Sequence, residues 1–156
     1  MFIQPEIWNG RLEIILDKVP NTKQSTRFRA YIDKATGKAK GYAYQSEKVK
    51  SEELSLVQAI EKQLPDDWII KDTPMSIGIT YQYILPKHAK SKHREAIKNG
   101  IKVYKDTAPD LSDNLNKLLF DSMQKCVITN DSKFINIHRL EKIYGFEEKT
   151  IIEIFY

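Results

Sequence analysis

Apolar residues recur at two spacings along the chain, and each spacing predicts a different kind of element. Alternation with a period of two predicts half-buried strands, because successive side chains of a strand point to opposite sides. The clearest case is MSIGITYQYIL, residues 75 to 85, whose first side carries Ile77, Ile79, Tyr81 and Tyr83. Further strands are predicted in RLEIIL, SKFINIHRLEK and KTIIEIFY, with a short one through YAY.

Spacings of three and four residues predict helices in three places. The first is expected to start at Ser51, a good N-cap, and to stop at Pro65. A short helix is expected from Ser91 to Gly100, and a leucine-rich helix within PDLSDNLNKLLFD, residues 109 to 121. The stretch NTKQSTRFRAY favours a loop because it is rich in short polar residues. The mixed order predicts an α+β fold, a small mixed β-sheet packed against two main helices.

The chain has the size and composition of one ordinary globular domain, expected to span residues 1 to 156. Hydrophobic residues make up 41% and charged residues 29%, and no apolar run reaches the roughly 20 residues of a membrane helix. The N-terminus shows no secretory signal pattern. The single cysteine, Cys126, excludes an internal disulfide, which suits a cytoplasmic location. It is more typical of a small buried residue than of a nucleophile.

Charge is distributed unevenly along the chain. The net charge is +4, but residues 87 to 105 carry seven Lys or Arg and one acid, an excess of +6. This segment leads directly into the aspartates of PDLSDNLNKLLFD. A basic segment beside an acidic one suggests a polyanion held next to a metal site, because phosphates require cations and hard cations require carboxylates. A solvated basic loop is the alternative.

The acidic residues of the leucine-rich helix fall in a narrow stripe. Asp110, Asp113, Lys117 and Asp121 are spaced by three, four and four residues, opposite a core side of leucines. Asp110 and Asp113 could simply cap the helix. However, Asp131 follows in a short loop, and three carboxylates with open positions for water and phosphate would suit Mg²⁺ or Mn²⁺. Lys117 could then stabilise negative charge on a phosphate, or could instead form a salt bridge within the helix.

Other common catalytic motifs are absent from the sequence. The three histidines and one cysteine do not have zinc-ligand spacing. Neither GxxxxGK[ST] nor GxGxxG occurs, so no nucleotide cofactor is expected, and GxSxG is missing as well. The acidic stripe therefore remains the strongest candidate for chemistry.

Several segments resemble the RusA-type Holliday junction resolvases, small endodeoxyribonucleases common in phages and prophages. PDLSDNLNKLLFDSM is similar to the family hallmark PDLDNLxKxxxDAL, and NDSKFINI is similar to its DDSQI-like segment. KVPNTKQSTRFR, LPKHAKSKHREAIKNG and RLEKIYGFEEKTIIEI resemble the family's early basic loop, lysine-rich segment and terminal hairpin. The resemblance covers about residues 10 to 156.

The resemblance implies homodimers that bind four-way DNA junctions and, with Mg²⁺ or Mn²⁺, nick two strands symmetrically. By position in the motifs, it implies metal-binding roles for Asp110, Asp113 and Asp131, and a catalytic role for Lys117. Asp121 matches a structural or supporting aspartate. Asn130 replaces the first aspartate of the DD pair, keeping a carbonyl oxygen but losing a charge.

Ser112 is a further departure, because it widens the spacing of the paired aspartates from two to three. Asp110 would stay on the aspartate face if it is helical, or would lie in a bulged loop if it is not. Both departures motivate a second hypothesis, a catalytically weak or inactive relative that serves a mobile element as a DNA-binding or protein-interaction module. A third is cleavage of other branched DNA, such as flaps or forks.

A two-fold dimer would suit the approximate two-fold symmetry of a four-way junction. Basic side chains would then position phosphates without reading sequence. The residues expected to do so are Lys23, Arg27, Arg29, Lys87, Lys90, Lys92 and Arg94. The sequence thus predicts a metal-dependent nuclease for branched DNA, in the cytoplasm of a bacterium or a phage-infected host, with no membrane partner.

Overall fold

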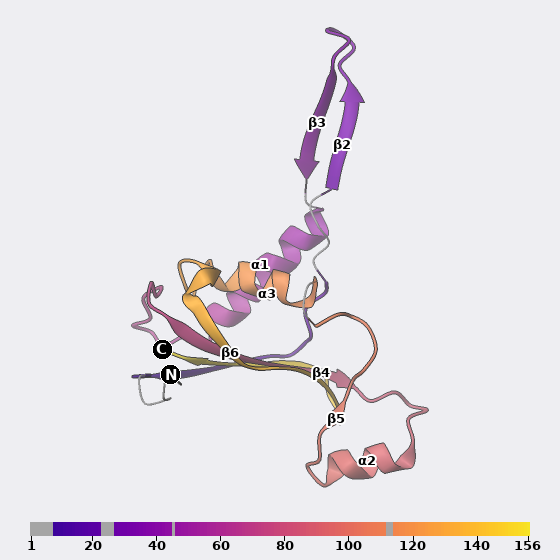
Figure 1. The fold of residues 1–156 in the computed structure, drawn as a ribbon, viewed down its shortest axis with the longest axis vertical. Coiled ribbons are helices and arrows are strands. Elements are labelled where there is room, and N and C mark those ends of the chain that lie inside the picture. Colours follow the sequence, from indigo (N-terminus) through magenta and orange to yellow (C-terminus); the bar gives the residue numbers. More distant parts are fainter. Residues whose placement is uncertain (1–7, 23–26, 45, 112–113) are drawn as a thin grey trace.

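The computed structural model describes residues 8–22, 27–44, 46–111 and 114–156. Figure 1 shows the elements in chain order: β1 (Arg11–Leu16), β2 (Arg27–Ile32), β3 (Ala39–Tyr44), α1 (Glu47–Glu61), β4 (Met75–Ile84), α2 (Ser91–Lys98), β5 (Val103–Tyr104), α3 (Asn114–Met123), the 3₁₀ turn η2 (Asp131–Lys133), β6 (Phe134–Gly145) and β7 (Lys149–Phe155).

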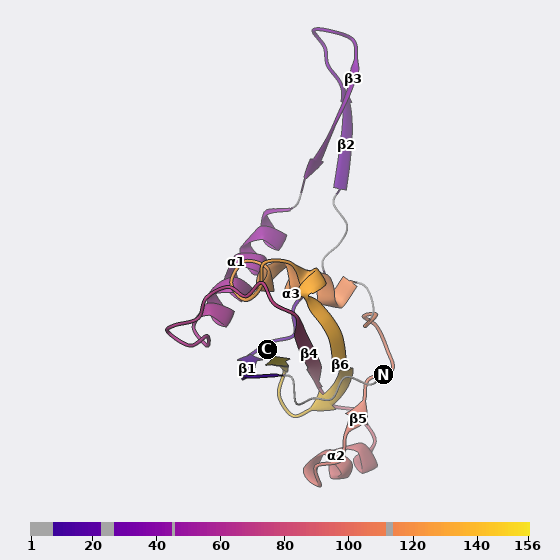
Figure 2. The same ribbon diagram turned by 60° about the vertical axis from the view of Figure 1, so that its left-hand side comes forward.

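Five strands form the main sheet, in the order β1-β7-β4-β6-β5. The central pair β4 and β6 is parallel, and the other neighbouring strands pair antiparallel. Helices α1 and α3 lie on one face of this sheet (Figure 1). Strands β2 and β3 form a separate hairpin that projects away from the sheet and helices in both views (Figure 2). The predicted α+β fold, a mixed sheet packed against two main helices, is confirmed.

The hydrophobic core fills the space between the sheet and the two helices. Alternate residues of β4, from Met75 to Tyr81, are fully buried, as the period of two predicts. The apolar side of α3 packs on them through Leu115, Leu118, Leu119 and Met123. Burying a side chain of this size stabilises the fold by about 1.5–3 kcal/mol. The leucine-rich segment is therefore fixed as a helix by the sheet below it.

Strand β4 is more deeply buried than the prediction of a half-buried strand. Its opposite side is covered in the first seven residues, so that Ser76 and Thr80 are buried as well. Side chains of β6 close this side: His138 and Asn136 hydrogen-bond to Ser76, and Glu141 accepts a hydrogen bond from Thr80. A polar layer thus covers the face of the sheet that the helices leave open.

Helix α1 starts earlier than predicted. Its N-cap is Ser46, whose side chain accepts a hydrogen bond from the backbone N–H of Val49, whereas Ser51 lies within the helix. Ser46 has the extended backbone of an N-cap, and Glu47 places an acid in the first turn. The residues around Ser51 are compatible with a helix, so the helix extends past that serine towards the N-terminus instead of beginning there.

The predicted loop in NTKQSTRFRAY is wrong for its second half, which forms β2. Arg27 to Ile32 pair with Ala39 to Tyr44 in antiparallel register. Within residues 27–32, two arginines and a tyrosine alternate with the apolar Phe28, Ala30 and Ile32. This period of two suits a strand once a partner strand is present. The turn between the strands is closed by hydrogen bonds between Asp33 and Lys38 and between Gly37 and Asp33.

The depth of the α3 packing gives a first prediction. Leu118→Ala would remove a side chain that is 1% exposed, and the resulting cavity is expected to cost about 2–5 kcal/mol of unfolding free energy. Leu54→Ala removes the same atoms from α1, where Leu54 is 59% exposed, and is expected to cost less than about 0.5 kcal/mol. Chemical denaturation measures both. Similar losses for the two variants would contradict this packing.

Candidate active site

The chain segment that leads to Asp110 is fastened to strand β6. The side-chain amine of Lys142 donates to the backbone carbonyls of Thr107 at 2.7 Å and Pro109 at 2.6 Å. The backbone N–H of Lys105 also donates to the carbonyl of Lys142 at 2.9 Å. Asp110 follows as an exposed residue outside any helix. Of the two placements left open by Ser112, the structure therefore has Asp110 in a loop before α3.

A buried hydrogen-bond relay fixes the next residue. Tyr81 of β4 donates through its hydroxyl to the side-chain oxygen of Asn116 at 2.8 Å. The side-chain N–H of Asn116 in turn donates to the backbone carbonyl of Leu111. Burial raises the pKa of Tyr81 far above its ordinary value, with a smaller contribution from Tyr83, so the hydroxyl remains a donor. The relay ties the residue after Asp110 to the centre of the sheet.

Sequence reasoning missed Asn116, although a signal was present. Asn116 stands on the leucine-rich side of α3, between Leu115 and Leu118, and is buried. A buried amide requires hydrogen-bond partners, so an asparagine among core leucines indicates a specific polar contact. Its partners, Tyr81 and the Leu111 carbonyl, could not be identified before the strand and the helix were placed together.

Asp131 opens the 3₁₀ turn η2 and is exposed. The side-chain oxygen of Asn130 accepts a hydrogen bond from the backbone N–H of Ser132 at 2.9 Å and so caps this turn. Asp72 braces the same loop, since it accepts a hydrogen bond from Thr129 at 2.6 Å and lies 3.3 Å from the amine of Lys133. These contacts, led by that of Thr129, lower the pKa of Asp72. The loop that carries Asp131 is therefore well defined.

The turn η2 and the start of β6 lie against α3. The rings of Phe120 and Phe134 meet edge to face with centroids 5.5 Å apart. Figure 1 shows the start of β6 towards the C-terminal end of α3, whereas Asp110 precedes the N-terminal end of that helix. Among the described residues, no three acidic, histidine or cysteine side chains gather in a metal-binding group. Asp113 and Ser112 lie outside the described residues, so the predicted metal triad stays a prediction.

Lys117 and Asp121 both lie on α3, outside its apolar side. Lys117 is exposed, and Asp121 is partly buried and engaged in a contact of its own. Lys117 is thus free of the core and able to reach a ligand from the surface of the helix.

The predicted DNA-binding residues fall in two separate regions. Arg29 lies exposed on the hairpin, whereas Lys87, Lys90 and Lys92 are exposed at the start of α2, at the other end of the molecule (Figure 1). Arg94 has a structural role, because its guanidinium donates to the carbonyls of Pro86 and Lys87. For Arg27 only the backbone is described, and Lys23 lies outside the described residues.

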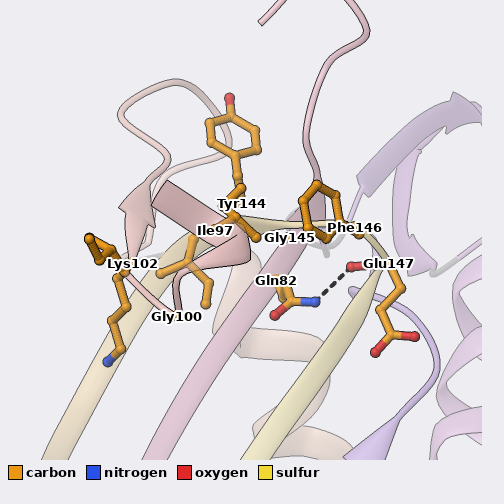
Figure 3. A pocket seen from close by; sticks show the side chains of 10 residues that line it. Gln82, Ile97, Gly100, Lys102, Tyr144, Gly145, Phe146 and Glu147 are labelled. Atoms are coloured by element: carbon orange, nitrogen blue, oxygen red, sulfur yellow. Dashed lines mark hydrogen bonds between the residues drawn. The ribbon is translucent and has the colours of Figure 1, made fainter. Parts of the chain in front are cut away.

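A surface pocket of about 420 Å³ lies at the α2 end of the sheet (Figure 3). Ile97, Ile143 and Phe146 contribute apolar walls, and Gln82 donates across it to the carbonyl of Glu147 at 2.9 Å. None of the predicted metal or DNA-binding residues that the structure describes lines it. The pocket is therefore separate from the predicted chemistry.

Two nucleophile arrangements can be set aside. Ser76, His138 and Glu153 form a chain of contacts, with Ser76 2.8 Å and Glu153 3.2 Å from the His138 ring nitrogens. Yet Ser76 is only 2% exposed and has no surface through which a substrate could reach it. Cys126 is also buried, and burial, with a smaller contribution from Glu61, raises its pKa to about 11. This confirms the interpretation of Cys126 as a core residue.

The comparisons with known proteins place the chain in a class. A family model described as Endodeoxyribonuclease RusA matches residues 18–155, which is most of the chain. The protein is therefore an endodeoxyribonuclease by class. More narrowly, the chain belongs to the RusA family, whose general activity is the resolution of Holliday junctions. No match was found among curated proteins. No helix in the described ranges is long and apolar enough to cross a membrane.

The Tyr81–Asn116 relay gives a second prediction. Asn116→Ala would leave the buried Tyr81 hydroxyl and the partly buried Leu111 carbonyl without this partner and is expected to cost about 1–3 kcal/mol of unfolding free energy. If Asp110 holds the predicted metal, Asn116→Ala should also weaken Mn²⁺ binding, measured by calorimetry, because the Leu111 carbonyl beside Asp110 loses its donor. Tyr81→Phe keeps that donor and should leave Mn²⁺ affinity closer to wild type. Equal Mn²⁺ affinity in wild type and Asn116→Ala would contradict a positioning role for the relay.

The open face of the sheet gives a pH prediction. Burial raises the pKa of Glu153, but contacts with Arg11, His138 and Arg139 outweigh it and the net pKa is lowered. A carboxylate with a lowered folded pKa stabilises the protein above its unfolded pKa and loses that effect as pH falls through the folded value. Glu153→Gln should therefore destabilise the protein at pH 7, with a difference that shrinks below about pH 4.

Thermal unfolding of both proteins across pH 3 to 7 measures this difference. Glu13→Gln is the matched control, because Glu13 contacts the same Arg11 side chain from a more exposed position. A wild-type advantage that is independent of pH would show that the Glu153 charge is not responsible.

Proposed function

We propose that this protein nicks branched DNA, with the four-way junction as its preferred substrate, in a reaction that depends on Mg²⁺ or Mn²⁺. The observation that carries the proposal is the RusA family match over residues 18–155. The placement of the described part of its motif supports it: residues 109–111 form a loop before α3, Lys142 and Asn116 hold its backbone carbonyls, and Asp110 within it is exposed.

The residues proposed to hold the metal fit a hard cation by their chemistry. Asp110 and Asp131 are exposed carboxylates, and Asp113 is the third proposed ligand. Oxygen donors of this kind suit Mg²⁺ and Mn²⁺. When bound, the ion would activate water and stabilise charge on the phosphate. Asn130 is proposed to act through the loop instead, because its side-chain oxygen already caps the η2 turn.

The remaining polar residues would bind and orient the substrate. Lys117 is exposed on the helix that follows Asp113, so its amine could approach a phosphate without crossing the core. The exposed lysines before α2 and Arg29 on the hairpin would hold phosphates on either side of the site. A homodimer would present two such sets to the two equivalent strands of a junction.

The fourth prediction concerns cleavage. Wild type should give paired nicks in a synthetic four-way junction with Mg²⁺ or Mn²⁺, and Asp113→Asn or Asp131→Asn should lower the rate by at least the roughly 10–100-fold that loss of a residue supporting a metal ligand costs. Asp66→Asn removes a similar exposed charge after α1 and should cleave normally. Gel analysis of end-labelled strands measures the rates. Unchanged nicking in Asp113→Asn would refute the proposed site.

The main alternative is a DNA-binding relative without activity. The structure offers one reason to test it, since Asn130 stands in place of an acid and its oxygen is occupied by the Ser132 N–H. This alternative predicts junction binding without nicks and no Mn²⁺ site by calorimetry. Asn130→Asp preserves a good N-cap and adds a charge, so on the proposed function it should tighten Mn²⁺ binding. Flap and fork substrates, tested in parallel, distinguish among branched DNAs.

A further inference from the structure

The β2–β3 hairpin projects from the body of the protein as an arm. Its two strands pair with each other in a sheet of their own, and both views show them leading away from the main sheet and the helices (Figures 1 and 2). Arg29, one of the predicted phosphate contacts, lies exposed on this arm. The direction in which the arm leaves the body therefore decides where Arg29 can meet a ligand.

Cross-strand contacts stiffen the arm along its length. All six residues of β2 pair with residues of β3. The ring of Tyr42 contacts the rings of Tyr31 and Tyr44, at centroid distances of 6.2 and 6.0 Å. The guanidinium of Arg29 lies 5.6 Å from the centre of the Tyr44 ring. Because these contacts hold the two strands together as one ribbon, the arm is expected to move as a unit about its base.

At the base of the arm, Glu52 of α1 holds the incoming chain. One oxygen of its carboxylate accepts a hydrogen bond from the backbone N–H of Asn21 at 2.8 Å, and the other accepts one from the side-chain N–H of Asn21 at 2.9 Å. The side chain of Glu52 is only 9% exposed. Two hydrogen bonds to one carboxylate fix the angle between the partners as well as their distance. We call this pair of contacts the Glu52–Asn21 clasp.

The residues just before Asn21 are fastened to the C-terminal part of the chain. The backbone N–H of Val19 donates to the carboxylate of Glu148 at 2.8 Å, and the hydroxyl of Thr150 donates to the carbonyl of Lys18 at 2.8 Å. The chain is thus fixed on the body up to Val19. The clasp follows as the last contact between the body and the incoming chain before the arm, among the residues that the structure describes.

The chain that leaves the arm runs into the same helix. Helix α1 begins at Glu47, directly after its N-cap Ser46, and Glu52 stands in its second turn. Both ends of the arm are therefore anchored within the first two turns of α1. The clasp closes the arm at its base, in the way that a second bolt prevents a bracket from turning.

Helix α1 also packs on α3, the helix that follows the Asp110 loop. Leu56 and Ile60 of α1 are buried in one cluster with Leu115 and Leu119 of α3. The arm and the Asp110 loop are in this way anchored on the same pair of packed helices. The direction of the arm relative to the candidate site then depends on the clasp.

The length of the arm makes this direction important. Six residues at about 3.3 Å each give a ribbon roughly 20 Å long. A tilt of about 10° at the base would displace its far end by about 3.5 Å, close to the distance of about 3.4 Å per nucleotide along one DNA strand. A small change at the clasp is therefore enough to shift a bound strand by one phosphate.

We propose that Glu52 is a positioning residue for the reaction. Through Asn21 it sets the direction of the arm relative to α1, and with it the phosphate of a bound DNA strand that meets the candidate metal site. The effect on DNA rests on the proposed function, whereas the control of the arm's direction does not.

The first test measures the direction of the arm without DNA or metal. Spin labels at Thr36→Cys in the turn of the arm and at Gln58→Cys on α1 report one distance within each chain, when labelled protein is diluted with unlabelled protein. Cys126 is buried and stays unlabelled. Pulsed electron resonance should give a narrow distance distribution in the wild-type background and in Glu61→Ala. Glu52→Ala should give a distribution at least about twice as wide.

The second test maps each nick in an end-labelled four-way junction with Mn²⁺. Glu52→Ala should raise the share of nicks at neighbouring phosphates at least about threefold, because a loosened arm lets the bound strand shift along the site. Glu52→Gln keeps an acceptor for the backbone N–H of Asn21 and should cut close to the wild-type pattern. Asn21→Ala loses only the side-chain half of the clasp and should fall between them. Glu61→Ala, which removes the same charge from the far end of α1, should match wild type.

A distance distribution that stays narrow in Glu52→Ala would overturn the proposal. Slower nicking at unchanged positions would overturn it as well, because a general loss of stability gives that result. If wild type fails to nick the junction, the proposed function is refuted, and the distances between the labels still decide whether the clasp directs the arm.

Discussion

The hydrogen bond from Tyr81 to Asn116 is the constraint on which the candidate site depends. Both groups are buried, so neither can exchange this partner for water without a cost of about 1–3 kcal/mol. The bond therefore links α3 to β4 at a fixed point, and the leucines of α3 on either side of Asn116 are buried around it. Through the Leu111 carbonyl the same asparagine also holds the loop beside Asp110. The same asparagine therefore contributes both to the packing of α3 and to the placement of the loop before it.

The sheet acts as a platform for several polar loops. Lys142 of β6 binds the carbonyls before Asp110, and Asp72, just before β4, braces the loop of Asp131. The site segments are thus exposed at their carboxylates and held through their backbones. This combination suits residues that must meet a cation and a phosphate, because a positioned ligand loses little freedom on binding.

The charged and apolar surfaces are divided among separate elements. Charged side chains on the open face of the sheet pair with Glu153, and Glu141 accepts a hydrogen bond from Thr80. Few of the charges on this face are therefore available to a ligand. Two groups of exposed cations stand on the hairpin and before α2, at opposite ends of the long axis (Figure 1). Cations at both ends of the molecule fit an extended polyanion better than a small molecule.

The sequence by itself determined the α+β class, the main strands, the core side of α3 and the motif that resembles the RusA family. These depend on local periodicity and residue type, which can be read directly from one amino-acid sequence. Only the tertiary structure decided that Asp110 precedes α3, that residues 27–32 form a strand, and that Tyr81, Asn116 and Leu111 form a relay. Each of these depends on a partner distant in sequence, and hydrogen bonds across such distances leave no periodic signal.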